Sequence, residues 1–165
     1  MAIEEIQIPF SEQLQERTNW CWAATARCVS HSYNSRSNFT QCTIAKSASG
    51  CRVCSQCNQP FHLEGPLRVT SNLAGTQAGY LNWRKIKSEI RAGCIICAKS
   101  AWDEDGGHFV SIYGFRSEGR DHDLYIYDTN QGEVFMSHQD FKTNYFNIGE
   151  WFFTYFTSKT GTVGA

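Results

Sequence analysis

The chain has 165 residues, which is enough for one domain with a substantial buried core. Hydrophobic residues make up 41% of the chain and aromatic residues 14%, and this composition excludes an intrinsically disordered protein. The 15 basic and 16 acidic residues nearly balance, so charge gives no reason to expect a nucleic acid or an anionic membrane as partner. Eight cysteines are the unusual feature, and they indicate disulfide bonds, a metal site or thiol chemistry.

Neither a membrane span nor a secretory signal is expected. No apolar run reaches the roughly 18 residues that a membrane-spanning helix needs. The segment Met1–Phe10 contains two glutamates and lacks the basic and apolar regions of a signal peptide. We therefore expect a protein that stays in the cytoplasm, one that leaves a bacterial cell by a signal-independent route, or a mature or excised domain.

Helical patterns dominate the first half of the chain. Apolar residues at helical spacing predict a helix over Asn19–Tyr33, with the asparagine as its N-cap. A second short helix is expected at about Thr40–Ala48. Residues 49–59 are rich in Cys, Ser and Gln and are expected to form a loop. Isoleucines at helical spacing predict a further helix over Trp83–Ile90, with basic residues facing outward.

Strand patterns dominate the second half. In the last predicted strand, alternation places Trp151, Phe153 and Tyr155 on one face. This segregation indicates an α+β fold in one domain, residues 1–165, with a helical part at about 10–93 and a β part at about 94–158. The predicted strands are Cys94–Ala101, His108–Phe115, Leu124–Asp128, Glu133–Ser137 and Glu150–Thr157.

Cys21 is a candidate nucleophile. It lies in the first turn of the predicted first helix, where unpaired N–H groups and the helix dipole favour the reactive thiolate. The alternative interpretation is a small apolar residue packed between two tryptophans. Gln15, six residues earlier, could donate its side-chain amide to an oxyanion, with the backbone N–H of Cys21 as the second donor. A solvated surface glutamine is the alternative for this residue.

His108 and Asp128 are candidate partners for that thiol. His108 follows two glycines at the start of a predicted strand, and histidine is the natural base for a thiol near neutral pH. Asp128 ends a strand on its apolar face, so its carboxylate needs a partner, which the Nδ1–H of His108 would supply. A turn histidine and a turn aspartate are the alternatives, and Asn130 could orient the histidine instead. Weaker candidates are the other histidines, His31, His62, His122 and His138.

The four candidate residues occur along the chain in the order Gln, Cys, His and Asp, and this order is typical of a known family. The sequence resembles papain-like cysteine peptidases, and more closely the small avirulence-type effector proteases of plant-associated bacteria. The resemblance covers most of the chain. The residues that carry it are Gln15 through Trp22-Ala23-Ala24, Gln41-Cys42 with Ile44-Ala45, Cys57-Asn58, Gly107-His108-Phe109-Val110, Asp128, Gly149-Glu150-Trp151 and Thr154-Tyr155.

The resemblance implies a papain-like peptidase fold, with a helical lobe packed on an antiparallel sheet or half-barrel and the site in the cleft between them. It implies that Cys21 is the nucleophile, His108 the general base, Asp128 the orienting acid and Gln15 the oxyanion donor. One departure is Thr129, where many relatives have proline after the aspartate.

The implied function is a cysteine endopeptidase of the effector or toxin type that needs no cofactor. A protein or peptide is the expected substrate, the chain is expected to be a monomer, and a host partner could activate it. Two alternatives stay open. The same site could serve a transglutaminase, a glutamine deamidase or an amidase, or the fold could be a non-catalytic binding module.

The remaining cysteines divide into two groups. Cys42, Cys51, Cys54 and Cys57 form a local cluster that could hold disulfides, free structural thiols or, less favourably, zinc with His62 nearby. The other group is expected to be small core residues, with two members on a strand and facing opposite sides; these are Cys28, Cys94 and Cys97.

Overall fold

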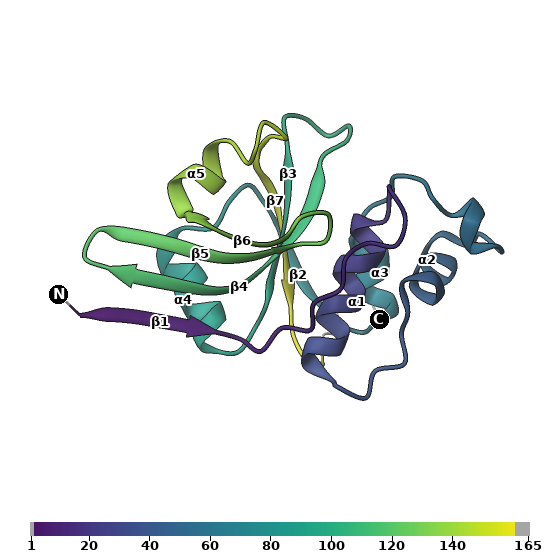
Figure 1. The fold of residues 1–165 in the computed structure, drawn as a ribbon, viewed down its shortest axis with the longest axis horizontal. Helices are drawn as coiled ribbons and strands as arrows, with labels where there is room; N and C mark the ends of the chain where they lie inside the picture. The colour runs from purple at the N-terminus through teal and green to yellow at the C-terminus, as the bar shows by residue number, and fades with distance from the viewer. Residues whose placement is uncertain (1, 161–165) are drawn as a thin grey trace.

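The computed structural model describes residues 2–160 and combines a seven-stranded antiparallel sheet with helices (Figure 1). The helices are α1 (Cys21–Tyr33), α2 (Gln41–Ser49), α3 (Glu64–Val69), α4 (Trp83–Arg91) and α5 (His138–Thr143), with a short 3₁₀ helix at Cys54–Gln56. The strands are β1 (Ile3–Gln7), β2 (Leu73–Ala78), β3 (Ile96–Ala101), β4 (His108–Glu118), β5 (Asp121–Asp128), β6 (Gly132–Ser137) and β7 (Glu150–Thr157).

The strand order in the sheet is β2-β7-β3-β4-β5-β6, and β1 pairs with β4. Strand β4 is long enough to pair with two strands along one edge. Its first half pairs with β3, from Ser100 opposite His108 to Ile96 opposite Ile112, and its second half pairs with β1. On its other edge, β4 pairs with β5. The expected α+β fold is confirmed, and strands β1 and β2 and helix α3 were not predicted.

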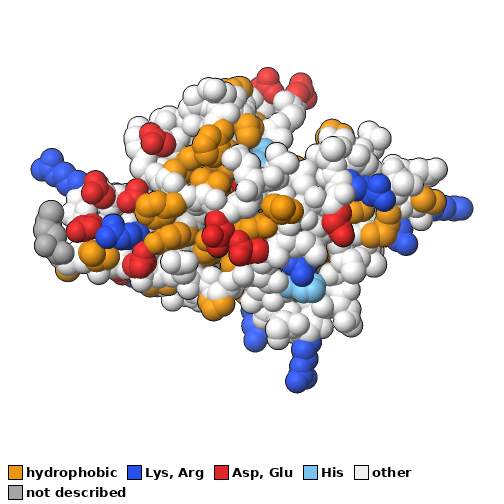
Figure 2. All heavy atoms as spheres, in the orientation of Figure 1, with side chains coloured by type: hydrophobic (Ala, Val, Ile, Leu, Met, Phe, Trp, Pro, Cys, Tyr) orange, Lys and Arg blue, Asp and Glu red, His pale blue; other side chains and the backbone are white. Residues whose placement is uncertain are grey.

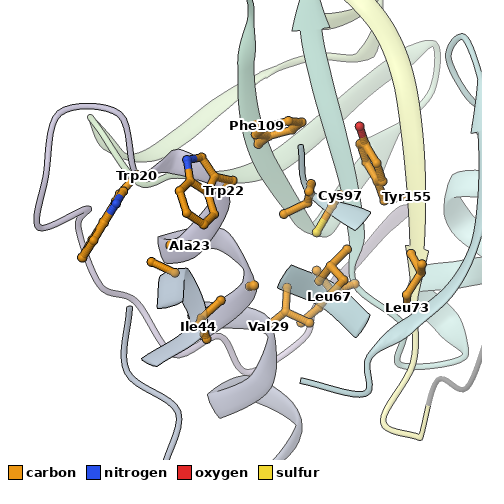
Figure 3. Packing of buried hydrophobic residues seen from close by; sticks show 14 of the residues in the cluster. Trp20, Trp22, Ala23, Val29, Ile44, Leu67, Leu73, Cys97, Phe109 and Tyr155 are labelled. Atoms are coloured by element: carbon orange, nitrogen blue, oxygen red, sulfur yellow. The ribbon is translucent and has the colours of Figure 1, made fainter. Parts of the chain in front are cut away.

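Two hydrophobic clusters cover opposite faces of the sheet. Alternation along β3 shows this, because Cys97 belongs to one cluster and its neighbours Ile96 and Ala98 belong to the other. Helices α1–α3 pack on the Cys97 side, beside the sheet in Figure 1. Helices α4 and α5 contribute to the second cluster. Figure 3 shows the first cluster, in which Trp22 of α1 lies toward Phe109 of the sheet and Val29 of α1 lies beside Leu67 of α3.

The start of α1 differs from the prediction by one residue. Trp20, not Asn19, occupies the N-cap position, and it makes no side-chain capping bond. The backbone N–H of Asn19 instead donates to Asn58 Oδ1 at 2.8 Å. Cys21 is therefore the first residue of the helix. The second helix begins as expected after Thr40, whose side chain forms a capping box with Thr43.

A β-bulge changes the facing of β7. Lys99 lies opposite Phe153 and the next residue, Ser100, lies opposite Trp151, so Phe152 is an extra residue in the ladder. The bulge reverses the alternation at this point. Trp151 packs in the cluster with α4 and α5, whereas Phe153 and Tyr155 pack in the cluster with α1. The expectation that these three aromatic residues share one face was wrong.

Within residues 2–160, no helix is long and apolar enough to cross a membrane. On the face in Figure 2, hydrophobic side chains gather over the sheet and acidic side chains lie beside them. The same view shows the molecule hollowed between the sheet and the helices, with a histidine side chain visible in the hollow.

Candidate active site

Sheet pairing brings His108 and Asp128 together. His108 is the first residue of β4 and Asp128 is the last residue of β5, and the two strands are antiparallel neighbours with Ser111 opposite Tyr127. The start of one strand therefore meets the end of the other. The Nε2 atom of His108 lies 2.7 Å from Asp128 Oδ1. The sequence predicted this pair but assigned the hydrogen bond to Nδ1. Since Nε2 makes it, Nδ1 is the nitrogen that is free to serve Cys21.

Gly107 sets the approach to His108. Its φ angle is +105°, a conformation that side chains rarely adopt. A Cβ atom at this position would lie 2.6 Å from the backbone oxygen of Ser100 and 2.8 Å from the Cβ of Ala101. Only glycine therefore lets the chain pass this close to β3 before it enters β4.

The charges of the pair stabilise each other. Burial alone lowers the pKa of His108, but the hydrogen bond that His108 donates to Asp128 and the interaction with the Cys21 side chain outweigh it and raise that pKa to about 9. Burial alone raises the pKa of the Asp128 carboxyl, but the His108 hydrogen bond and charge outweigh it, and the net shift is downward. His108 therefore stays largely protonated at neutral pH and Asp128 stays ionised.

Asp128 is fully buried and is held by three residues besides His108. The Tyr145 hydroxyl donates to its Oδ2 at 2.6 Å, and the Asn130 backbone N–H donates to its Oδ1 at 2.8 Å. The Gln131 backbone N–H lies 3.3 Å from the same Oδ1. Asn130, the alternative orienting residue, thus contributes its backbone to the carboxylate, and Asp128 makes the contact with His108.

Cys21 lies in the same cleft as His108. It is a free, partly buried thiol at the first position of α1, where the backbone N–H groups are unpaired. Cys21, His108 and Gln15 all line a cleft of about 530 Å³ between the α1 side and the sheet. Aromatic residues and the acidic loop before β4 form much of the remaining wall; these residues include Trp22, Phe61, Phe109, Tyr155, Glu104 and Asp105.

The Gln15 side chain is held at both ends. Its Nε2 donates to the backbone oxygens of Thr18, at 2.8 Å, and Arg17, at 3.1 Å. Its Oε1 accepts a hydrogen bond from the Thr129 hydroxyl at 3.0 Å. The amide therefore points its nitrogen along the segment that leads into Cys21. The side chain is partly exposed to the cleft, and hydrogen bonds hold it at both ends.

A disulfide-bonded loop supports the segment before Cys21. Two indole N–H groups donate to this loop: that of Trp20 to the Cys57 oxygen at 3.0 Å and that of Trp22 to the Gln59 oxygen at 2.9 Å. The Asn58 side chain binds the backbone N–H of Asn19, as described above. Residues on both sides of the thiol are thus tied to the loop by hydrogen bonds.

The cysteines of this loop are paired as Cys42–Cys54 and Cys51–Cys57. Their Cα–Cα separations, 5.6 and 5.8 Å, are typical of disulfides. The zinc alternative is therefore wrong, and among residues 2–160 no group of three or more His, Cys, Asp and Glu side chains is placed to hold a metal ion.

The other three free cysteines differ in environment. Cys28 and Cys97 are buried, and burial raises the pKa of the Cys28 thiol to about 11 and that of the Cys97 thiol to about 12. These two are core residues, as expected. Cys94 precedes β3 rather than belonging to it and is only partly buried, so its assignment to the core was wrong. Burial also raises the pKa of its thiol.

Sequence reasoning missed Tyr145 and the contribution of Thr129. Tyr145 follows α5 and makes an isolated bridge with Gly149, outside any pattern that marks a strand. Its hydroxyl reaches Asp128 only because α5 packs against β5 and β7 in the folded sheet. The sequence around Tyr145 is mostly polar, and a tyrosine in such a sequence is usually a surface residue. The local sequence therefore gave no reason to assign Tyr145 to the site.

The comparisons agree with this architecture. The model of the family described as papain-like cysteine protease AvrRpt2 matches residues 2–146. A search of curated protein sequences found no significant match. The chain belongs to the matched family and is a papain-like cysteine protease, a hydrolase.

Solved structures show the same fold at low sequence identity. A putative C39-like peptidase from Bacillus anthracis is 14% identical with a TM-score of 0.60, covering 95% of this chain and 99% of that one. The peptidase domain of Streptococcus ComA, a bifunctional ABC transporter, is 15% identical with a TM-score of 0.62, covering 92% and 98%. Digestive procathepsin L 3 of Tenebrio molitor is 10% identical with a TM-score of 0.58, covering 93% and 69%.

Proposed function

We propose that this protease is an endopeptidase that cuts protein or peptide substrates through a thioester at Cys21. The observation that supports this most is that His108, which is hydrogen-bonded to the buried Asp128, lines the same cleft as the free Cys21 thiol at the first position of α1. A nucleophile, a base and an orienting acid from separate elements meet there.

The reaction proceeds in two halves. The Cys21 sulfur attacks the peptide carbonyl, and the resulting oxyanion accepts hydrogen bonds from the Cys21 backbone N–H and a Gln15 Nε2–H. The C–N bond breaks as His108 gives its proton to the leaving amine. Water then attacks the thioester, His108 takes a proton from it, and the Cys21 sulfur leaves as the acid product forms.

Gln15 would have to release one of its resting contacts to serve as oxyanion donor. Both of its N–H groups are occupied by the Arg17 and Thr18 carbonyls. The longer bond, 3.1 Å to Arg17, is the one that an oxyanion would replace. A charged acceptor makes a hydrogen bond about twice as strong as a neutral carbonyl does.

A test separates the proposal from its rivals by product. Wild-type protein and Cys21→Ala are incubated with a peptide library, and the products are read by mass spectrometry. New peptide termini that only the wild type generates support the endopeptidase. Ammonia released without chain cleavage indicates a deamidase or amidase instead, and new isopeptide links indicate a transglutaminase.

Limiting iodoacetamide with peptide mapping tests the nucleophile itself. We expect Cys21 to react faster than Cys28 and Cys94, and His108→Ala to slow that reaction. If Cys21 reacts no faster than the other thiols and the variant does not change its rate, a non-catalytic binding module becomes the better interpretation.

The proposed setting is outside the reducing cytoplasm, as an effector or toxin-type protease delivered by its producer. Two disulfides support this, because such bonds persist in oxidising environments. A monomer that a host partner activates is part of the same proposal. Activity assays with and without extract of a host cell test the need for a partner, and equal rates would contradict it. Gel filtration tests the oligomeric state, and the elution volume of a dimer would contradict a monomer.

A further inference from the structure

Thr129 makes two hydrogen bonds to one residue of the cleft. It directly follows Asp128 at the end of β5 and is almost completely buried. Its hydroxyl donates to Gln15 Oε1 at 3.0 Å, and its backbone oxygen accepts the Gln15 backbone N–H at 2.7 Å. The same residue therefore holds both the main chain and the side chain of Gln15.

The backbone oxygens of Arg17 and Thr18 set the orientation of the Gln15 amide, and the Thr129 hydroxyl stabilises that orientation. The backbone oxygens of Arg17 and Thr18 can only accept hydrogen bonds, so the NH₂ end of the amide must face them. The oxygen end must then face Thr129, whose hydroxyl can donate to it. A side chain without a donor at position 129 would leave the partly buried amide oxygen without this hydrogen bond and the amide free to rotate.

We propose that Thr129 is a positioning residue that holds the Gln15 amide nitrogen where an oxyanion forms. The proposal rests on the function of Gln15 proposed above. Because Thr129 is bonded covalently to Asp128, it connects the oxyanion donor directly to the residue that orients His108. The oxyanion donor and the His108 side chain are thus both hydrogen-bonded to one segment at the end of β5, and this matters because oxyanion donors act only within a narrow geometry.

Three variants test this with a peptide that the wild type cleaves. Thr129→Val removes the hydroxyl and keeps the shape of the side chain, Thr129→Ser retains the hydroxyl, and Gln15→Ala removes the donor. We expect Thr129→Val to lower kcat about 10-fold with KM little changed, which is part of the 10²–10³-fold that a lost oxyanion donor costs. Thr129→Ser should restore most of kcat. Gln15→Ala combined with Thr129→Val should be no slower than Gln15→Ala alone.

A second readout separates this role from a general structural one. Alkylation of Cys21 by iodoacetamide forms no oxyanion but still depends on His108 and Asp128. Its rate should be unchanged in Thr129→Val. Thr129→Ala replaces the valine variant if urea unfolding shows that valine disturbs the fold.

Each adverse outcome has its own meaning. If Gln15→Ala lowers kcat and Thr129→Val does not, the positioning role is overturned and the oxyanion donor stands. If Gln15→Ala leaves kcat unchanged, Gln15 is not the oxyanion donor, and the role of Thr129 that rests on it is also contradicted. If Thr129→Val slows alkylation as much as turnover, the residue acts through Asp128 and His108, and the present inference is wrong.

Discussion

His108 Nε2 lies 2.7 Å from Asp128 Oδ1, and this contact makes the charge of each residue depend on the other. The pKa of His108 is raised to about 9, so the stability that its charged form contributes is fully present below the ordinary histidine value of about 6.5. That contribution is lost as the pH rises through about 9. The pKa of Asp128 is lowered, so its contribution is lost only when the pH falls through that lowered value.

This coupling predicts the alkaline limit of activity. In the proposed mechanism protonated His108 delivers a proton to the leaving amine, so kcat/KM should decline as the pH rises through about 9. Asp128→Asn removes the charge that raises the pKa of His108, so its decline should begin at lower pH and its turnover should drop by about 10-fold or more. The pH–rate profiles of both proteins measure this. An alkaline limb that does not move would contradict the assignment, and a wild-type rate would give the orienting role to Asn130 or to no residue.

Tyr145→Phe should weaken the His108–Asp128 pair, because it removes a hydrogen bond to the Asp128 carboxylate. The Tyr145 hydroxyl donates to the buried Asp128 carboxylate at 2.6 Å, and a hydrogen bond to a buried charge contributes about 1.5–3 kcal/mol. We expect a loss of that size in the free energy of urea unfolding, together with a lower kcat. Tyr113→Phe, which changes a buried tyrosine stacked on Phe10, is the matched control and should leave kcat unchanged. Equal losses in the two variants would show that the hydroxyl of Tyr145 has no special function.

Gly107→Ala should displace His108. The substitution costs about 1–3 kcal/mol from the positive φ alone, and its Cβ would also collide with the backbone of Ser100. Gly106 has a φ of +87° but nothing within 4 Å of its added Cβ, so Gly106→Ala carries the strain without the collision. We expect kcat/KM to fall much further in Gly107→Ala. Similar activity in the two variants would mean that His108 does not depend on this close approach.

The paired cysteines predict a defined thiol count and a specific vulnerability. Without reductant, alkylation of the unfolded chain should modify four of the eight cysteines, because two disulfides hold the rest. Replacing both Cys51 and Cys57 by serine should cost about 2 kcal/mol for this short loop and also lower activity, because the loop binds both tryptophans beside Cys21. Cys94→Ser, a change at a free and partly buried thiol, is the control. Full activity in the double variant would show that the loop does not hold the nucleophile.

Local patterns were sufficient to predict much of this molecule. The apolar alternation that ends in Asp128 and the glycines before His108 predicted two strands, and those strands carry the pair that now lies at hydrogen-bond distance. The helix behind Cys21 and the last strand, Glu150–Thr157, were also confirmed. In each case the local spacing of apolar residues was sufficient to predict the element, without knowledge of the segments that pack against it.

Features that depend on distant partners escaped prediction. Strand β1 alternates exposed and half-exposed residues and is a strand only because it pairs with β4. Trp151 changes face because a bulge inserts one residue opposite β3, which no count along β7 reveals. Tyr145 approaches Asp128 through the packing of α5, and the choice of Nε2 over Nδ1 in His108 follows from how the two strands meet.

Gln15 and Thr129 are separated by 114 positions in the chain. A ribosome makes the segment with Cys21 first and the end of β5 much later, so Cys21 is synthesised long before its proposed partners His108 and Asp128. Contacts of such sequence separation are also slow to form in folding, because the entropy of closing the long loop between them is lost before the contact is gained. A chain that ends before β5 should therefore be harmless to the cell that makes it. The proposed site is complete only when the segment around Cys21 has packed against the end of β5.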